Sequence, residues 1–243
     1  MLRITVFLFL FLKLSSCDLS SESSKKLILK KGNGVVDIDG NRYKTIIIGN
    51  QEWMCENLKV TRYSNGIEIP DVVPIDNPNN ISDYEEYENS IIASYNISAK
   101  MRYNNDINKS MLYTYPVICN KNKVSPKGWH VPNRNEILVL LKNIENEGDY
   151  TSDNLSLVNR YNTSLLNING SGFRTSSGGF CEYGLSECWW FKHPKIKVGA
   201  ISVGNYQQWL NINLEYNIVK FRLVNASMPL NFACAIRCLK DKK

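Results

Sequence analysis

The sequence predicts an α+β fold made mostly of short antiparallel strands and long loops, with one or two helices. Short runs of β-branched and aromatic residues alternate with Gly, Asn and Asp pairs, which are typical of turns between antiparallel strands. Residues 133–148 combine helical apolar spacing with an N-terminal capping pattern. A chain of 243 residues that is 43% hydrophobic can also bury a substantial core.

The first 16 residues have the pattern of a signal peptide. Arg3 supplies a positive charge, and the apolar run that ends at Leu12 is far shorter than the roughly 20 residues of a transmembrane helix. The next residues, Leu14-Ser15-Ser16-Cys17, have the form of a bacterial lipobox. We therefore expect lipidation of Cys17, which would anchor the protein in the cell envelope, at the outer membrane or cell surface. The alternative is an ordinary signal peptide that leaves Cys17 as a free thiol.

Residues 17–33 are expected to form a flexible tether, because serine and lysine dominate them. The apolar residues Leu27-Ile28-Leu29 interrupt this stretch and could pack on the domain or rest on the membrane. The folded domain is expected to occupy residues 34–243.

The domain opens with β-strand signals. Two β-branched runs, residues 35–38 and 43–48, flank Asp39-Gly40-Asn41, which is typical of a hairpin turn. Gly49-Asn50 predicts a second turn. The acidic residues of segment 37–41 could also suggest a calcium loop, but their spacing differs from an EF-hand and the closing Glu is missing. We therefore predict a turn here rather than a metal site.

Residues 70–100 are predicted to be a long loop, because prolines and asparagines interrupt them. Within this loop, residues 83–88 form an acidic, aromatic cluster. This cluster is expected to be a solvated helix face or loop. The alternative is a site for a cation or a partner, since long loops are often functional.

The clearest helix signal follows Pro132. Asn133 is a good N-cap, and Glu136 completes a capping box three residues later. Apolar residues then recur at helical spacing through Ile144, and Gly148 is expected to end the helix. Beyond residue 167, Gly-rich turns return, and strands are predicted in four apolar runs: residues 201–203, 209–214, 219–224 and 232–239.

Gly128-Trp129-His130-Val131-Pro132 is the most specific of a series of short motifs. The others, in chain order, are Trp53-Met54-Cys55-Glu56-Asn57-Leu58, Tyr103-Asn104-Asn105-Asp106, Leu112-Tyr113, Ser171-Gly172-Phe173-Arg174, Gly179-Phe180, Trp189-Trp190 and Ala235-Ile236-Arg237-Cys238. This ordered set resembles the Fibrobacter succinogenes major paralogous domain, over about residues 35–241. The resemblance implies a C-type-lectin-like fold on secreted or surface-anchored bacterial proteins, often lipoproteins. It implies no particular activity.

The resemblance also bears on the cysteines of the domain. Members of the family often carry one cysteine before the Gly-Trp-His-Val-Pro motif and another in the final strand. Cys119 and Cys238 match these positions, although Cys119 lies further upstream than is usual. Cys55 and Cys234 are additions to the family pattern. Cys181 and Cys188 would close a hairpin-sized loop. For an oxidising compartment, the hypothesised disulfides are therefore Cys119–Cys238, Cys55–Cys234 and Cys181–Cys188.

The sequence offers few groups for catalysis. His130 lies within a motif and His193 precedes Pro194, and a lone His most often hydrogen-bonds within a fold. The sequence has no phosphate loop, dinucleotide fingerprint or serine nucleophile elbow, so we expect no catalytic residue, no metal and no cofactor. The net charge of +6, or +4 without Arg3 and Lys13, is mild and forms no basic stripe, which argues against nucleic acid as a partner.

One enzyme class is an alternative. Formylglycine-generating enzymes have a related fold and use a cysteine pair after a Gly-Gly segment, and Gly178-Gly179-Phe180-Cys181 with Cys188 resembles this superficially. The cysteine spacing is longer than in that family, and the rest of its signature is missing. An oxidising compartment favours a structural disulfide at these cysteines instead.

The main hypothesis is a binding function. The calcium-binding triplets of C-type lectins are absent from the sequence, but Trp189 and Trp190 could stack on sugar rings, or could equally be core residues. We expect a binding site in residues 178–191, together with the acidic residues 83–88. The sequence thus predicts a non-enzymatic cell-surface lipoprotein, held to the membrane by its N-terminal lipid. Its domain would be a disulfide-braced interaction or adhesion module for an unknown surface glycan or protein, with a calcium-independent glycan-binding protein as the first alternative.

Overall fold

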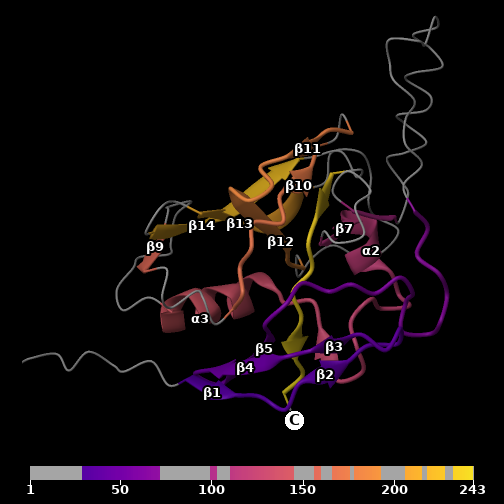
Figure 1. Cartoon of the computed structure of the whole chain (residues 1–243), viewed down its shortest axis with the longest axis horizontal. Helices are drawn as coiled ribbons and strands as arrows, with labels where there is room; N and C mark the ends of the chain where they lie inside the picture. The colour runs from indigo at the N-terminus through magenta and orange to yellow at the C-terminus, as the bar shows by residue number, and fades with distance from the viewer. Residues whose placement is uncertain are drawn as a thin grey trace, which may run out of the picture.

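The computed structural model describes residues 29–71, 99–102, 110–144, 156–159, 166–175, 178–192, 206–214, 218–227 and 232–242 (Figure 1). These residues contain sixteen strands and two helices. Every ladder between the named strands is antiparallel. The predicted fold, mostly antiparallel strands with few helices, is therefore confirmed. No helix within these ranges is long and apolar enough to span a membrane.

The first sheet gathers strands from both ends of the described chain. Its order is β1 (Leu29–Lys31), β4 (Thr45–Ile48), β5 (Gln51–Met54), β16 (Leu239–Lys240) and β8 (Trp129–His130). A separate hairpin of β2 (Val35–Val36) and β3 (Arg42–Tyr43) follows β1.

Strand β1 lies inside the segment that was predicted to be a tether. It pairs with Ile46–Ile48 of β4, and Leu29 packs against the core. This pairing packs the apolar side chain of Leu29 against the core. It also gives the backbone at the edge of β4 a neighbouring strand. Strand β1 is therefore part of the first sheet, and Leu29 packs on the domain.

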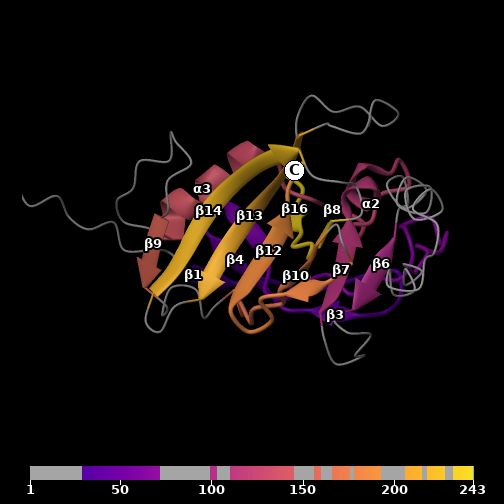
Figure 2. The same ribbon diagram turned by 90° about the horizontal axis from the view of Figure 1, so that it is seen from above.

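The second and third sheets lie side by side (Figure 2). The second has the order β11 (Phe180–Cys181), β10 (Phe173–Arg174), β15 (Ala233–Cys234), β7 (Met111–Thr114) and β6 (Lys100–Arg102). The third has the order β12 (Ser186–Trp190), β13 (Tyr206–Leu214), β14 (Ile218–Ser227) and β9 (Ser156–Asn159). The strands predicted at 209–214 and 219–224 are the paired strands β13 and β14, whereas the predicted strand at 232–239 is divided into β15 and β16. The strand predicted at 201–203 lies outside the described residues.

Helix α3 (Arg134–Ile144) lies between the first and third sheets (Figure 1). Its predicted capping box is formed, because the backbone N of Asn133 donates to Glu136 Oε2 at 2.9 Å and the backbone N of Glu136 donates to Asn133 Oδ1 at 3.1 Å. The buried face of α3 packs with side chains of both sheets, including Ile46, Trp53, Leu210 and Phe221. The predicted end at Gly148 lies outside the described residues. The other helix, α2 (Tyr115–Cys119), has a proline in its first turn and was not predicted from the sequence.

Strand β12 separates two core clusters and is buried on both faces. Cys188 and Trp190 belong to the first cluster, which lies around Tyr113 and Phe232. Trp189 belongs to the second cluster, which includes helix α3. The alternation of strand side chains therefore sends neighbouring residues of β12 into different halves of the core.

Candidate functional site

Trp189 and Trp190 do not lie at a surface. Both are 0% exposed. The indole of Trp190 donates to the carbonyl of Tyr113 at 2.6 Å and packs edge-on against Tyr115 and Phe232, with ring centroids 5.1 and 5.7 Å away. The indole of Trp189 donates to the carboxylate of Glu187. The structure therefore contradicts the prediction that these residues stack on sugar rings, because strand β12 is covered on both faces.

The six cysteines of the described residues are all free thiols, so none of the three hypothesised disulfides is formed in the structure. The thiol of Cys234 is hydrogen-bonded to Cys188. Cys234 therefore lies next to Cys188 rather than Cys55, its hypothesised partner, and Cys188 lies next to Cys234 rather than Cys181. Burial raises the pKa of the Cys119 thiol to about 11, and it also raises the pKa of the Cys55 thiol. Buried, protonated thiols of this kind are poor nucleophiles. The lipidation residue Cys17 lies outside the described residues.

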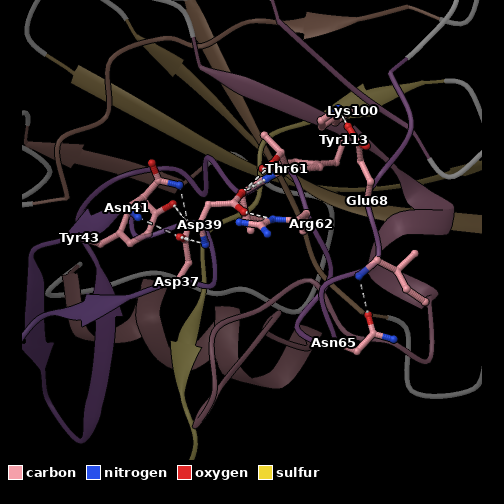
Figure 3. Close-up of polar contacts among 12 residues, drawn as sticks. Asp37, Asp39, Asn41, Tyr43, Thr61, Arg62, Asn65, Glu68, Lys100 and Tyr113 are labelled. Carbon is pink, nitrogen blue, oxygen red and sulfur yellow. Dashed lines mark hydrogen bonds and ion pairs between the residues drawn. The ribbon is translucent and has the colours of Figure 1, made fainter.

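Segment 37–41 forms the predicted turn (Figure 3). Asp37 Oδ1 accepts hydrogen bonds from the backbone N of Asp39 at 2.9 Å and of Asn41 at 3.0 Å. Its Oδ2 accepts from Asn41 Nδ2 at 2.9 Å and from the Tyr43 hydroxyl at 2.6 Å. The Asp37 carboxylate thus holds its own turn closed. Among the described residues no group of three or more His, Cys, Asp or Glu side chains is arranged to hold a metal ion.

Asp39 fastens this turn to the neighbouring loop (Figure 3). Its carboxylate accepts from the backbone N and the hydroxyl of Thr61 and forms an ion pair with Arg62, with Nε and Oδ1 2.6 Å apart. Partial burial raises the pKa of Asp39, but the hydrogen bonds from Thr61 and Arg62 outweigh it, so this pKa lies below its usual value. The loop after β5 is thereby held beside the β2–β3 hairpin.

A pocket of about 260 Å³ lies next to this turn; we call it the hairpin pocket, and it is lined by residues 36–38, Val60, Ser64 and residues 124–127. Val36 and Ile38 are 47% and 41% exposed, whereas Asp37 between them is buried. Large apolar side chains therefore face solvent at the pocket while the acid points into the fold, which is the reverse of the usual distribution of apolar and acidic residues. Ile67, another exposed apolar residue, lies in the turn that Tyr63 closes by donating its backbone N to the Ile67 carbonyl at 2.8 Å.

The rim of the hairpin pocket is basic. Segment 120–128 contains three lysines and no acidic residue, and Lys121, Lys123 and Lys127 are exposed. Ser64 ties this segment to the pocket, because its hydroxyl donates to the Asn122 carbonyl at 2.7 Å and its backbone N donates to the Lys123 carbonyl at 2.8 Å. The pocket therefore combines apolar walls with one lysine, Lys127, on a segment that carries two further exposed lysines.

A second pocket has a volume of about 150 Å³; we call it the polar pocket, because the residues that line it are of polar or charged types, namely Glu56, Asn57, Lys59, Ser110, Asn167, Asn169 and Arg237. Arg237 also belongs to the core beneath it. Its Nε donates to Asn57 Oδ1 at 2.9 Å, and its Nη2 pairs with Glu187 Oε1 at 3.1 Å. Arg237 and Glu187 are 1% and 0% exposed, so this is a buried ion pair below a polar opening.

The buried pair connects several segments. Arg237 donates to the carbonyls of Met54 and Leu166, and its guanidinium lies 4.5 Å from the ring centroid of Trp189. Glu187 Oε2 accepts from the backbone N of Asn169 at 3.0 Å and of Gly170 at 3.2 Å. Burial lowers the pKa of the Arg237 guanidinium, and Glu187 opposes that shift. The residues that line the polar pocket are thus positioned by the core.

His130 is held between two carboxylates, which confirms the prediction that it hydrogen-bonds within the fold. Its Nδ1 lies 2.6 Å from Asp241 Oδ1, and its Nε2 lies 3.1 Å from both oxygens of Glu136. The hydrogen bond with Glu136 raises the pKa of His130, and the bond with Asp241 adds to this against the effect of burial. Burial raises the pKa of Glu136, but hydrogen bonds from His130 and from the Asn133 backbone outweigh it, so the pKa of Glu136 is lowered.

These shifts predict a pH dependence of stability. The raised pKa of His130 adds stability that is complete below its unfolded value of 6.5 and is lost as the pH rises through the folded value. The lowered pKa of Glu136 adds stability that is complete above its unfolded value of 4.5 and is lost as the pH falls through the folded value. We therefore expect His130→Gln to lower the urea midpoint at about pH 5.5 and to have a smaller effect at about pH 9. The group is partly exposed, so the difference should be about 1 kcal/mol or less; an equal loss at both pH values would contradict the assignment.

Sequence reasoning missed both pockets. The signal for the hairpin pocket was present in the alternation of Val36, Asp37 and Ile38, but the sequence does not show which face of a short strand is covered. In the region predicted to bind, residues 178–191, the exposed large apolar side chains are Tyr183 and Leu185. The acidic cluster at residues 83–88 lies outside the described residues.

The motifs that suggested a family are spread over all three sheets, apart from the motif at residues 103–106, which lies outside the described residues. A family model, the Fibrobacter succinogenes major domain (Fib_succ_major), matches residues 46–240. No curated protein and no solved structure matches the chain. The family match extends from strand β4 to strand β16 and so includes the polar pocket and the buried Arg237–Glu187 pair, whereas residues 36–38 of the hairpin pocket precede it. The chain therefore belongs to the Fibrobacter succinogenes major domain family.

Proposed function

We propose that this chain is a non-enzymatic lipoprotein of the bacterial cell envelope whose domain, C-type-lectin-like in fold, binds a protein ligand. The signal peptide pattern and the lipobox at Cys17 support export and lipid anchoring at the outer membrane or cell surface. The hairpin pocket is the observation that carries the binding function. Its ligand would be a protein segment with an apolar side chain next to carboxylates.

The apolar part of this proposal rests on Val36 and Ile38. Both are about half exposed beside a pocket that Val60, Val124 and Pro126 also line. Covering such side chains removes apolar surface from water, which stabilises a complex by about 25 cal/mol per Å² of that surface. A leucine or phenylalanine side chain of a partner is the kind of group that fits a pocket with these walls.

The charged part rests on the lysines of segment 120–128. Nearby acids do not offset them, because Asp39 is paired with Arg62 and Asp37 is enclosed by its own turn. Lys127 thus presents positive charge in the lining of the pocket, and the exposed Lys123 lies on the same segment. Carboxylates of a partner would gain from this field, chiefly in the rate of association and in specificity.

A binding protein is favoured over the cysteine-dependent oxidase. That alternative needs Cys181 and Cys188 as a reacting pair, but Cys188 is 1% exposed and contacts Cys234 instead. A thiol buried in an apolar cluster cannot meet a substrate without local opening of the fold.

The test uses the Cys17→Ser chain, which we expect in the soluble fraction while the unchanged chain stays with membranes. The probe is an array of acidic peptides that each carry one Leu or Phe. We expect the double variant Val36→Ser/Ile38→Ser to bind at least about tenfold more weakly, since the loss of 1.4 kcal/mol is tenfold in affinity. Added salt should weaken binding by the parent chain.

The matched control is Leu185→Ser, which removes an exposed leucine that is not among the residues lining the hairpin pocket. It should leave peptide binding unchanged. Equal weakening by Leu185→Ser, or no binding of any acidic peptide by the parent chain, would contradict the proposal.

The polar pocket favours a calcium-independent glycan as the second candidate ligand. Its lining offers amides, a carboxylate and ammonium and guanidinium groups, which are suited to sugar hydroxyls. Binding to neutral oligosaccharides that is lost in Asn169→Ala but kept in Val36→Ser/Ile38→Ser would favour this candidate over the peptide.

A further inference from the structure

Cys188 and Cys234 face each other across a short parallel contact between β12 and β15. Trp189 and Ala235 form a parallel bridge, in which the backbone N of Ala235 donates to the Cys188 carbonyl at 2.9 Å and the backbone N of Trp190 donates to the Ala235 carbonyl at 3.1 Å. In a parallel pair the preceding residues of the two strands are also opposite each other. Cys188 therefore lies directly across from Cys234.

The two side chains also lie on the same side of this contact. Cys188 and Cys234 belong to the first core cluster, whereas Trp189 and Ala235 belong to the second. Neighbouring strands are about 4.8 Å apart, which falls within the Cα separation of about 4.4–6.8 Å that a disulfide requires. The thiols contact each other, since Cys234 is hydrogen-bonded to Cys188, and both residues are buried.

We propose that Cys188 and Cys234 are joined by a disulfide in the exported protein. This pairing replaces the hypothesised Cys181–Cys188 and Cys55–Cys234 bonds. It would join the third sheet to the second at the strands that separate the two core clusters. The remaining hypothesised pair, Cys119–Cys238, is compatible with it.

The oxidant is a disulfide-bonded dithiol or glutathione disulfide. The thiolate of one cysteine attacks the oxidant's disulfide, which forms a mixed disulfide and releases one thiol of the oxidant. The second cysteine, as its thiolate, attacks the protein sulfur of the mixed disulfide, forms the Cys188–Cys234 bond and releases the second thiol. Two electrons and two protons thus pass to the oxidant. Because both thiols are buried once folded, the reaction belongs to the period before the core is packed.

Peptide mapping tests the pair directly. The full chain is reduced, unfolded and refolded in a glutathione redox buffer, free thiols are alkylated, and the protein is digested after Lys, Arg and Glu. This digestion places Cys181, Cys188, Cys234 and Cys238 on four different peptides. We expect residues 188–192 to be linked to residues 223–237, in a species that reduction separates. Linkage of Cys188 to Cys181, linkage of Cys234 to Cys55, or alkylation of both thiols would overturn the proposal.

Matched variants keep the test decisive if one substitution disturbs folding. Cys181→Ala should retain the linked peptides, whereas Cys188→Ala should leave Cys234 open to alkylation in denaturant. The reducing agent dithiothreitol should lower the urea midpoint of the parent and of Cys181→Ala by a larger step than that of Cys188→Ala/Cys234→Ala. The proposal depends on the proposed export only for its oxidant. Refolding in vitro supplies that oxidant, so a failure of the pairing is distinguishable from a failure of export.

Discussion

Glu187→Gln is expected to lower the free energy of unfolding by about 3–5 kcal/mol, because it leaves Arg237 charged and unpaired in the core. Both side chains are almost fully buried. Glutamine also has a single acceptor oxygen, whereas Glu187 accepts from Arg237 and Trp189 with Oε1 and from two backbone N–H groups with Oε2. If the amide NH₂ of glutamine replaced Oε1 it would face the donors of Arg237 and Trp189, and if it replaced Oε2 it would face two backbone N–H groups. Urea denaturation at neutral pH measures the loss.

A second substitution separates the cost of an unpaired charge from the value of the pair. Replacing both partners, as Glu187→Leu/Arg237→Met, removes the buried charges together, and such replacements are often neutral or stabilising. The double variant should therefore be more stable than Glu187→Gln. The control Glu68→Gln changes an exposed carboxylate 3.9 Å from Lys100 and should cost less than about 1 kcal/mol. If Glu187→Gln lost no more stability than this control, the buried pair would not be an important part of the core.

The sequence was sufficient to predict those elements whose hydrogen-bonded residues are close together along the chain. Asn133 and Glu136 are three residues apart, and their capping box is present at the start of helix α3. The turn at residues 37–41 depends on Asp37 and the backbone immediately after it. In both cases the residues that decide the structure are within one turn of each other.

Contacts between distant segments could not be derived in this way. The neighbour of Cys188 is set by the bridge between Trp189 and Ala235, which depends on how the second and third sheets meet. Glu187 and Arg237 are charged, and charged residues are expected at the surface unless a partner is known. The polar pocket, whose lining includes Arg237, was missed for the same reason.

The tryptophans show why a pair of adjacent aromatic residues does not by itself indicate a binding surface. Adjacent aromatic rings can stack on a sugar or fill a core, and the sequence left both roles open for Trp189 and Trp190. All five residues of β12 are buried, including Ser186 and Glu187, so neither face of the strand is exposed to solvent. The two rings fill different core clusters instead.

Trp190→Ala is expected to cost about 3–5 kcal/mol of unfolding free energy, which is the usual result of removing a fully buried tryptophan. The substitution would leave a cavity between Tyr115, Trp209 and Phe232, whose rings all pack edge-on against the indole. It would also leave the Tyr113 carbonyl without its donor. We expect lower urea and thermal midpoints and, if the remaining stability is small, a protein that does not fold.

Two further variants decide between a core role and a ligand role for Trp190. Trp190→Phe keeps an aromatic ring but removes the indole donor, so its loss should be smaller than that of Trp190→Ala. Leu185→Ala, at a side chain that is 65% exposed on the turn before β12, should change stability by about 0.5 kcal/mol or less. A Trp190→Ala protein that kept its urea midpoint but no longer bound oligosaccharides would contradict the core assignment, because a residue that fills a packed cluster cannot be removed without a change in stability.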